Sequence, residues 1–410
     1  MKSTEKPYIL IVTELFPADD KSYTGTFVLD QLKALMPHYN FVVLAPSFPA
    51  ILKYLFTPDI RYKKISDIRV YFIKDSSNDH LVKKIWRKIT SDKTVSQKNY
   101  QIKIGYRNKL LKLAKRLHQQ YNFQRVHGHE CFIGDEAAVI GNALHIPSII
   151  TIHGLYNLHL ESWGVQAMDL ILDNLRHSSK LLSISHKAGD SYAPHLLPNK
   201  PDIAIIPNGI NTMSQIIASP ALLRFKKQIK NRKVILAVGT LVWYKKFDLL
   251  IECAKQAYEA LGDAFIIIIA GNGSEDLKLR ALVKRYGLLD NVYFIGAIPP
   301  KLMSGWYEIA DFLAHPSIID SFSMVCLESM AHSKTIICTS AIGITEYITN
   351  KKEGFIVAPD SVNDFTAAIK TLLLDDSLRQ QMGKYAYRRS LDFHWNQITP
   401  KIRSIYESIS

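Results

Sequence analysis

The strongest constraint on the fold is a double series of short apolar segments that alternate with helical patterns. The first series begins at residues 8–12 and ends at 204–206, with helical stretches such as residues 27–36 between its members. The second series begins at residues 233–238 and continues to 354–357. Alternation of this kind predicts parallel sheets covered by helices, and two series predict two doubly wound α/β domains.

The length of the chain agrees with two domains. At 410 residues, 47% of them hydrophobic, the chain exceeds what a single core usually supports and has ample material for two. We expect an N-terminal Rossmann-like domain over residues 1–210, a C-terminal one over 211–393, and a final helix, about 394–410, that crosses back onto the first. Because ligands bind at the carboxyl ends of parallel strands, the expected site is a central cleft that both domains face.

The positive charge of the chain is concentrated in one segment. Residues 53–125 carry 19 Lys and Arg against 5 Asp and no Glu, which equals the net charge of +14 of the whole chain. Within it, residues 80–90 read as an interfacial helix with an apolar stripe and basic flanks, which favours an anionic membrane surface as partner. A helix packed on its own domain with a solvated basic face is the alternative. Nucleic acid is not expected, because stacked aromatic residues on a basic strand face, the usual signature of single-strand binding, are not evident.

The cysteines and the N-terminus indicate a cytoplasmic protein. Four cysteines stand far apart without any C-x-x-C spacing, which favours a reducing compartment over disulfides or a zinc site. The first apolar run, residues 8–12, is too short for a signal peptide. We expect a cytoplasmic location, with peripheral attachment to the inner face of the plasma membrane through the basic segment.

Two acidic residues flank the start of a predicted helix in the second half. Asp320 lies in a polar loop after the apolar segment 312–314, and Glu328 falls about two helical turns further on. Free N–H groups at the helix start hold negative charge, so this arrangement suits a nucleotide diphosphate sugar. Acidic residues at a helix start also act as caps, and that alternative stays open.

Glycines and a lysine follow two strands of the second series. Gly239 and Lys245 come after residues 233–238, where a glycine lets backbone approach a diphosphate and a lysine neutralises it. Gly271 and Gly273 form a second glycine-rich turn after the next strand. For those two glycines taken alone, tight-turn packing is the stronger interpretation, and the alternative for Lys245 is a solvated pair with Lys246.

Histidines near the strand ends of the first domain are candidates for ligand contact or for metal binding. His153 directly follows a predicted strand, although a lone histidine is commonly structural. His127, His129 and Glu130 form an HxHE cluster without a distant partner, and no Asp-x-Asp triplet occurs in the chain. We therefore expect neither a catalytic metal nor a cofactor.

Taken in order, the motifs resemble those of the family 4 glycosyltransferases, which have the GT-B fold. The likeness is strong in the second domain and weaker in the first, where it rests on FPADDKSYTGTF, THG and SISH. The motifs of the second domain, and of the segment that leads into it, are PNGI, VGTLVWYKKFDLLI, AGNGSED, HPSIIDSFSMVCLESMA and IGITEY.

This resemblance implies a role for each motif residue. Glu328 would hold the ribose hydroxyls of the donor and Asp320 a hydroxyl of the transferred sugar, while Gly25 would approach the donor phosphate or the acceptor and His153 the donor sugar. Lys245 would clamp the diphosphate. The remaining donor contacts would come from Gly239, Thr240, Gly271, Gly273 and the backbone amides of Phe322, Ser323, Met324 and Val325.

The chain departs from the family pattern at several of these positions. The first acid is Asp320 where the family has a glutamate, and Thr240 stands where an arginine usually assists the lysine. Serines replace glycines at Ser321, Ser323 and Ser333, which predicts a stiffer loop. These changes put the reach of Asp320 and the stabilisation of the leaving group in question.

The sequence as a whole predicts a retaining, metal-independent glycosyltransferase that extends a lipid-linked or envelope polysaccharide from a nucleotide diphosphate sugar, UDP-linked by expectation. Hexosyl and N-acetylhexosaminyl groups both fit. Two alternatives stay open: a sugar-nucleotide epimerase with the same fold, and a basic binding protein that has lost catalysis.

Overall fold

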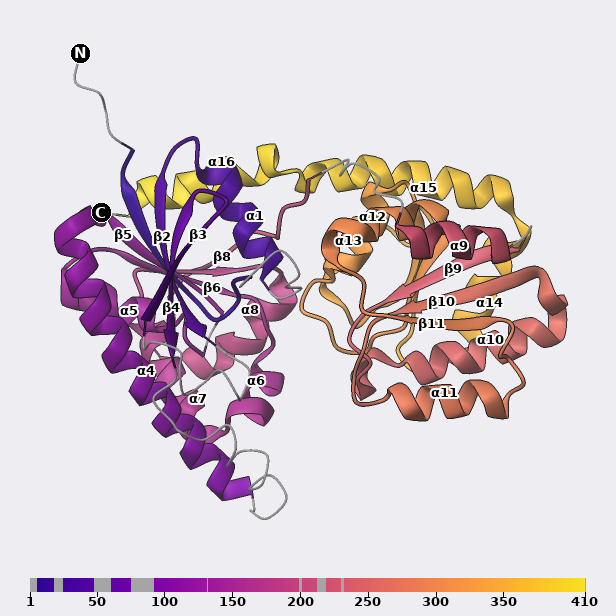
Figure 1. The fold of residues 1–410 in the computed structure, drawn as a ribbon, viewed down its shortest axis with the longest axis horizontal. Helices are drawn as coiled ribbons and strands as arrows, with labels where there is room; N and C mark the ends of the chain where they lie inside the picture. Colours follow the sequence, from indigo (N-terminus) through magenta and orange to yellow (C-terminus); the bar gives the residue numbers. More distant parts are fainter. Residues whose placement is uncertain are drawn as a thin grey trace. The chain divides into compact units, whose positions relative to one another are not determined.

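The chain divides into two compact units in the computed structural model (Figure 1). Unit 1 comprises residues 1–208 and 396–410, and unit 2 comprises residues 209–395. The boundaries expected from the sequence, after residues 210 and 393, lie beside these changeovers. The structure describes residues 6–17, 25–47, 60–74, 92–130, 132–198, 201–211, 219–229 and 232–409.

Unit 1 is built on an eight-stranded sheet with the strand order β3-β4-β2-β1-β5-β6-β7-β8. All pairs are parallel except β3 with β4. The strands are β1 (Tyr8–Thr13), β2 (Asn40–Ser47), β3 (Ile60–Ile65), β4 (Ile68–Lys74), β5 (Arg125–His129), β6 (Ser148–Ile152), β7 (Lys180–Ser183) and β8 (Ile203–Ile205).

The edge strand β3 corrects the expectation of a wholly parallel sheet. It joins β4 through Ser66 and Asp67, whose φ angles of 48° and 67° are those of a two-residue hairpin turn. The sequence missed β3 because its residues, IRYKKI, are exposed almost throughout and show no buried apolar alternation.

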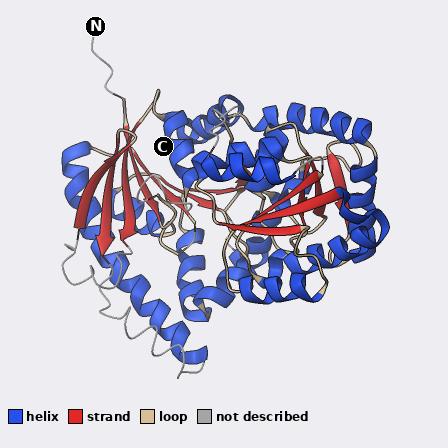
Figure 2. Cartoon of the chain, turned by 45° about the vertical axis from the view of Figure 1, so that its right-hand side comes forward, coloured by secondary structure: helices blue, strands red, loops and turns tan. Residues whose placement is uncertain are grey.

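Helices cover both faces of this sheet (Figure 2). The alternation of side chains along β5 shows how: Val126 joins the core beneath α4, whereas the neighbouring His127 points to the opposite face and contacts Tyr406 of α16. The helices are α1 (Thr26–Leu35), α4 (Asp92–Tyr121), α5 (Glu136–Leu144), α6 (Tyr156–Trp163), α7 (Val165–Arg176), α8 (His186–Tyr192) and α16 (Trp395–Ser408).

Part of the basic segment is used inside unit 1. Lys103 of α4 is buried, and its Nζ lies 2.6 Å from Asp135 Oδ1 and 2.8 Å from Glu136 Oε1. Asn174 of α7 donates to the other oxygen of Asp135 at 2.7 Å. This network ties three helices together, so the charge of Lys103 is not available to an external partner.

Unit 2 contains a six-stranded parallel sheet with the strand order β11-β10-β9-β12-β13-β14. Its strands are β9 (Lys233–Val238), β10 (Phe265–Ala270), β11 (Val292–Gly296), β12 (Phe312–His315), β13 (Thr335–Thr339) and β14 (Gly354–Val357). Its helices are α9 (Pro220–Ile229), α10 (Phe247–Leu261), α11 (Asp276–Arg285), α12 (Pro300–Ile309), α13 (Met324–Ala331), α14 (Val362–Leu374) and α15 (Asp376–Ser390).

Each sheet reverses its strand order at its first strand. In unit 1 the chain passes from β1 to β2 on one side and later returns to β5 on the other, and in unit 2 β9 lies between β10 and β12 in the same way. This is the doubly wound topology that the sequence predicts. Connections diverge at the reversal point, so the loops there leave room for a ligand.

One expected helix and one cysteine fall on residues that the structure does not describe. The interfacial helix expected at residues 80–90 lies outside the described residues, as does Cys131. Cys253, Cys326 and Cys338 are buried free thiols. Among the helices of the described ranges, none is both long and apolar enough to cross a membrane.

Candidate active site

Two loops at the reversal point of unit 2 bring Lys245 and Asp320 together. The loops follow the neighbouring strands β9 and β12 and therefore leave the same edge of the sheet. Lys245 ends a short 3₁₀ helix, Trp243–Lys245, and its Nζ lies 2.7 Å from Asp320 Oδ2. The two side chains are 17% and 14% exposed. The predicted cation and the first predicted carboxylate thus form one largely buried ion pair.

His315, the last residue of β12, completes this cluster. Its Nε2 lies 3.1 Å from Asp320 Oδ2 and 3.3 Å from Ser323 Oγ. Burial raises the pKa of Asp320, but the Lys245 cation and the His315 hydrogen bond outweigh burial and hold this pKa well below its ordinary value. Asp320 is therefore a fixed carboxylate, able to accept a hydrogen bond from a hydroxyl but not to act as an acid.

Backbone contacts hold the Asp320 loop in place. Ile318 N donates to Tyr244 O at 2.9 Å, which joins the loop to the turn that carries Lys245. Gly343 N donates to Asp320 O at 3.1 Å. A Cβ on Gly343 would lie 2.0 Å from Ser321 O, so only glycine allows this approach. The position of Asp320 is set by three segments that are far apart in the sequence.

The start of α13 follows directly. Ser323 precedes the helix with φ 86°, a left-handed backbone in a position where the family pattern has glycine. The N–H groups of Met324 and Val325 lie in the first turn, where they have no partner within the helix. The Phe322 amide differs from expectation, because it donates to Asp320 Oδ1 at 3.3 Å and thereby supports the loop.

Glu328 lies on α13 and is half-buried. Its Oε2 accepts a hydrogen bond of 2.7 Å from the hydroxyl of Tyr307 on α12. Sequence reasoning missed Tyr307 and His315. His315 gave a signal, since it directly ends a strand at the reversal point, whereas Tyr307 reads as an ordinary core residue of an amphipathic helix.

The glycines of the two turns after β9 and β10 pack against each other. Gly239 N donates to Ala270 O at 3.0 Å, and a Cβ on Gly271 would lie 1.8 Å from Gly239 O. A Cβ on Gly273 would lie 2.2 Å from Leu241 O. Close packing between the two turns thus requires Gly271 and Gly273. Thr240, beside them, is exposed.

Gly25 and His153, the remaining predicted residues, belong to unit 1. Gly25 precedes α1 with φ 76°, and a Cβ there would lie 2.2 Å from Leu15 O. His153 follows β6, and its Nε2 lies 3.1 Å from His129 Nδ1. Burial lowers the pKa of His153 well below its ordinary value, with the neighbouring histidines acting in the same direction. The imidazole is therefore neutral at physiological pH.

The HxHE cluster is engaged in hydrogen bonds within the protein. His127 Nδ1 lies 2.7 Å from the Tyr406 hydroxyl, and its Nε2 lies 2.8 Å from Thr151 Oγ1. Both ring nitrogens of His127 therefore have protein partners. Within the described ranges, no group of three or more His, Cys, Asp and Glu side chains is arranged to hold a metal ion.

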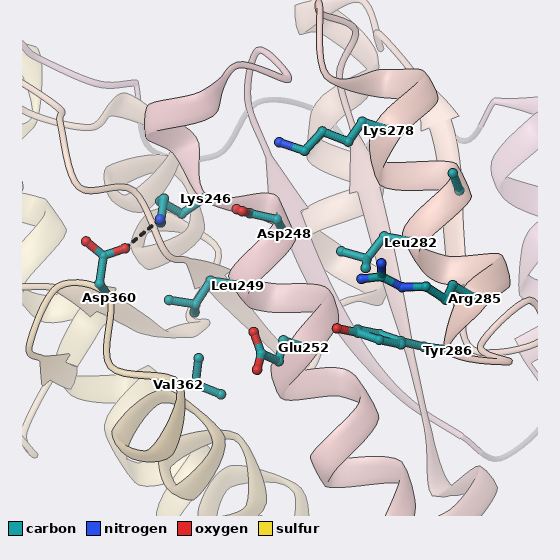
Figure 3. Close-up of a pocket in the computed structure, with 11 residues that line it drawn as sticks. Lys246, Asp248, Leu249, Glu252, Lys278, Leu282, Arg285, Tyr286, Asp360 and Val362 are labelled. Carbon is teal, nitrogen blue, oxygen red and sulfur yellow. Dashed lines mark ion pairs between the residues drawn. The ribbon is translucent and has the colours of Figure 1, made fainter.

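A surface pocket of about 570 Å³ lies elsewhere on unit 2, between α10 and α11 (Figure 3). Lys246, Lys278 and Arg285 line it together with three acidic residues, and Lys246 is paired with Asp360 at 2.6 Å. Because the opposite charges balance, this pocket does not favour a diphosphate. None of the predicted site residues lines it, and the ion pair at the reversal point remains the candidate site.

Comparison with known families matches both halves of the chain. The family described as "Glycosyltransferase Family 4" matches residues 26–213, and the family described as "Glycosyl transferases group 1" matches residues 221–389. An uncharacterized glycosyltransferase of Methanocaldococcus jannaschii is 25% identical over 308 residues, which is 75% of this chain and 82% of that protein.

Solved structures confirm the expected GT-B architecture. Sucrose-phosphate synthase from Thermosynechococcus elongatus aligns with a TM-score of 0.75 at 18% identity, over 98% of each chain. The Anabaena protein HepE in complex with UDP-glucose aligns with a TM-score of 0.71 at 16% identity, over 99% of this chain and 100% of that one. At such identities the likeness establishes the fold alone.

Replacing Lys245 by Met is expected to lower the free energy of unfolding by about 1–3 kcal/mol at pH 7. Without the cation, burial raises the folded-state pKa of Asp320 above its unfolded value, so the deficit in stability is fully present above that raised pKa and shrinks as the pH falls through it. The double variant Lys245→Met with Asp320→Asn should be more stable than Lys245→Met alone. Urea unfolding at pH 7 and pH 5 measures both effects.

The matched control is Lys246→Met, since Lys246 pairs with an Asp360 side chain that is 56% exposed. Its effect should stay within about 0.5 kcal/mol. If neither a lower pH nor the added Asp320→Asn change restores stability to Lys245→Met, the result would contradict a buried ion pair.

Proposed function

This chain belongs to the family 4, group 1 glycosyltransferases of the GT-B fold, and from that premise we propose a specific reaction for it. It transfers a hexosyl or N-acetylhexosaminyl group from a UDP-sugar to a lipid-linked or envelope glycan acceptor, with retention of the anomeric configuration. The observation that carries the proposal is the Lys245–Asp320 ion pair at the reversal point of unit 2, beside the first turn of α13.

The donor would lie along the start of α13. Lys245 and the first-turn N–H groups of Met324 and Val325 offer positive charge to a diphosphate. Asp320 accepts a hydrogen bond from a hydroxyl of the transferred sugar, because its carboxylate stays ionised. Glu328 accepts hydrogen bonds from the hydroxyls of the ribose. Sugar, diphosphate and ribose would thereby meet complementary groups in the order in which a nucleotide sugar presents them.

The transfer step rests on positioning and on electrostatics. The bond between the anomeric carbon and the diphosphate oxygen breaks, and the acceptor oxygen forms its bond on the same face of the sugar. The acceptor proton passes to the departing diphosphate, so the step needs no covalent protein nucleophile. Lys245 stabilises the charge that develops on the leaving group, and its contribution is large because the site is partly buried.

A uridine donor is the choice that the solved neighbours support. HepE has been solved with UDP-glucose and aligns along nearly the whole chain. The proposed step requires no metal ion or cofactor, since a lysine and a helix start supply the positive charge. An epimerase would consume the donor without any acceptor, so donor turnover in acceptor-free buffer separates the two reactions.

The acceptor side of the proposal rests on the basic surface of unit 1. Arg61, Lys63 and Lys64 are exposed along the edge strand β3, and Lys112 and Lys115 are exposed on α4. Such a surface attracts the anionic headgroups of a cytoplasmic membrane leaflet, with roughly 1 kcal/mol for each basic residue near the lipid. We propose a cytoplasmic protein that meets its acceptor at that surface.

Donor binding gives the first test. Lys245→Ala and Glu328→Ala are each expected to weaken UDP binding by about tenfold or more, since each removes a charged partner of the nucleotide. Isothermal titration calorimetry measures the affinity, with Lys246→Ala as the matched control on the neighbouring lysine. Unchanged affinity in both site variants would remove this site assignment and would favour a protein that has lost catalysis.

The stereochemical outcome gives a second test. A panel of UDP-, GDP- and ADP-sugars identifies the preferred donor, and proton NMR of the product identifies the new anomeric linkage. We expect an α-linked product from an α-linked UDP-sugar, formed at the same rate in the presence of EDTA. A β-linked product would overturn the retaining mechanism.

Membrane attachment gives a third test. Vesicles with anionic phospholipid should float the protein at physiological salt, and neutral vesicles should not. Replacing Arg61, Lys63 and Lys64 by Glu should reduce flotation, because it reverses the charge of β3. A protein that stays in the dense fraction with anionic vesicles would rule out the membrane part of the proposal.

A further inference from the structure

Tyr307 lies behind Glu328 and is itself almost inaccessible to solvent. Its side chain belongs to α12 and is 1% exposed, whereas Glu328 belongs to α13 and is half-buried. The hydroxyl of Tyr307 donates to Glu328 Oε2 at 2.7 Å. A partly exposed carboxylate is thus held on one oxygen by a buried donor from a different helix.

The ring of Tyr307 is fixed in turn. It stacks on the imidazole of His332 with a centroid distance of 5.1 Å and an interplanar angle of 27°. His332 Nδ1 lies 2.9 Å from the main-chain carbonyl oxygen of Glu328, so the imidazole that stacks on Tyr307 is itself anchored to the backbone of Glu328. Lys334 joins the same two regions, because its Nζ donates to Glu308 O at 3.0 Å.

The protonation states determine the direction of the hydrogen bond. Burial and the negative charge of Glu328 raise the pKa of Tyr307 well above its ordinary value, so the phenol keeps its proton. The tyrosine is then the donor and Glu328 the acceptor. A carboxylate has about four acceptor positions, and the bond from Tyr307 takes one of them.

We infer that Tyr307 is the positioning residue that holds Glu328 ready for the two adjacent hydroxyls of the donor ribose. This inference rests on the proposed role of Glu328. A free glutamate loses rotamer freedom when it binds a ligand, whereas one that is already hydrogen-bonded to a fixed donor has lost that freedom on folding. Tyr307 would touch no substrate and would act only through Glu328.

The test compares two nucleotides on one conservative variant. Tyr307→Phe keeps the ring and removes the hydroxyl. Its affinity for UDP should fall by about three- to tenfold, and its affinity for 2′,3′-dideoxy-UDP should not change, because that nucleotide offers Glu328 no hydroxyls. Calorimetric titration measures both affinities. Tyr258→Phe, on the half-exposed Tyr258 of α10, is the matched control.

Three results separate the possible failures. If Tyr307→Phe weakens both nucleotides equally, Tyr307 has a general structural role and the inference is overturned. If Glu328→Gln loses the preference for UDP over the dideoxy nucleotide while Tyr307→Phe keeps it, the inference alone fails. If Glu328→Gln also keeps that preference, the proposed ribose contact is wrong, and the inference, which rests on that contact, is wrong too.

A second variant covers poor folding of Tyr307→Phe. His332→Ala removes the stacking partner of the ring and leaves the hydroxyl in place. We expect this variant to lose affinity for UDP but not for 2′,3′-dideoxy-UDP, and by a smaller factor than Tyr307→Phe does. An unchanged ratio of the two affinities would overturn the inference.

Discussion

The central position of the first strand in each sheet is the constraint on which both units depend. Since β9 pairs with β10 on one side and β12 on the other, the loops that follow β9 and β12 must leave the same edge. A cation on one loop and a carboxylate on the other are thereby brought to the same edge. Strand order makes the Lys245–Asp320 pair possible, and the backbone hydrogen bonds and Gly343 fix its geometry.

Much of this could be predicted from the sequence, and the part that could not has a physical reason. Buried parallel strands are continuous apolar runs, so β9 was predicted at the bounds that the structure shows, residues 233–238. Exposed β3 carries no such run. Asp320 and Lys245 were recognisable because charged residues at strand ends are chemically distinctive.

Residues that act through other residues gave less signal. Tyr307 is a core aromatic by pattern, and only the packing of α12 on α13 reveals the carboxylate at its hydroxyl. The charge count of the basic segment likewise could not show that Lys103 belongs to a buried network of ion pairs.

Ser323 and Ser333 have positive φ angles of 86° and 58°, so two positions keep the backbone that glycine favours while carrying a side chain. Ser323 therefore stores a small strain in the loop beside the site, whereas Ser333 lies beyond the other end of α13.

The return of the C-terminal helix to unit 1 has a consequence for how the chain is made. Tyr406 contacts His127 and Tyr39, and Arg125 donates to Ile409 O at 3.2 Å, so one face of the first sheet is covered by residues that follow unit 2 in the sequence. During synthesis the first 208 residues of unit 1 emerge first, yet they lack this covering until residues 396–409 have also been made. Unit 2 is continuous in sequence and can close before unit 1 is complete, and a nascent chain must keep the open face of the first sheet from aggregating until then.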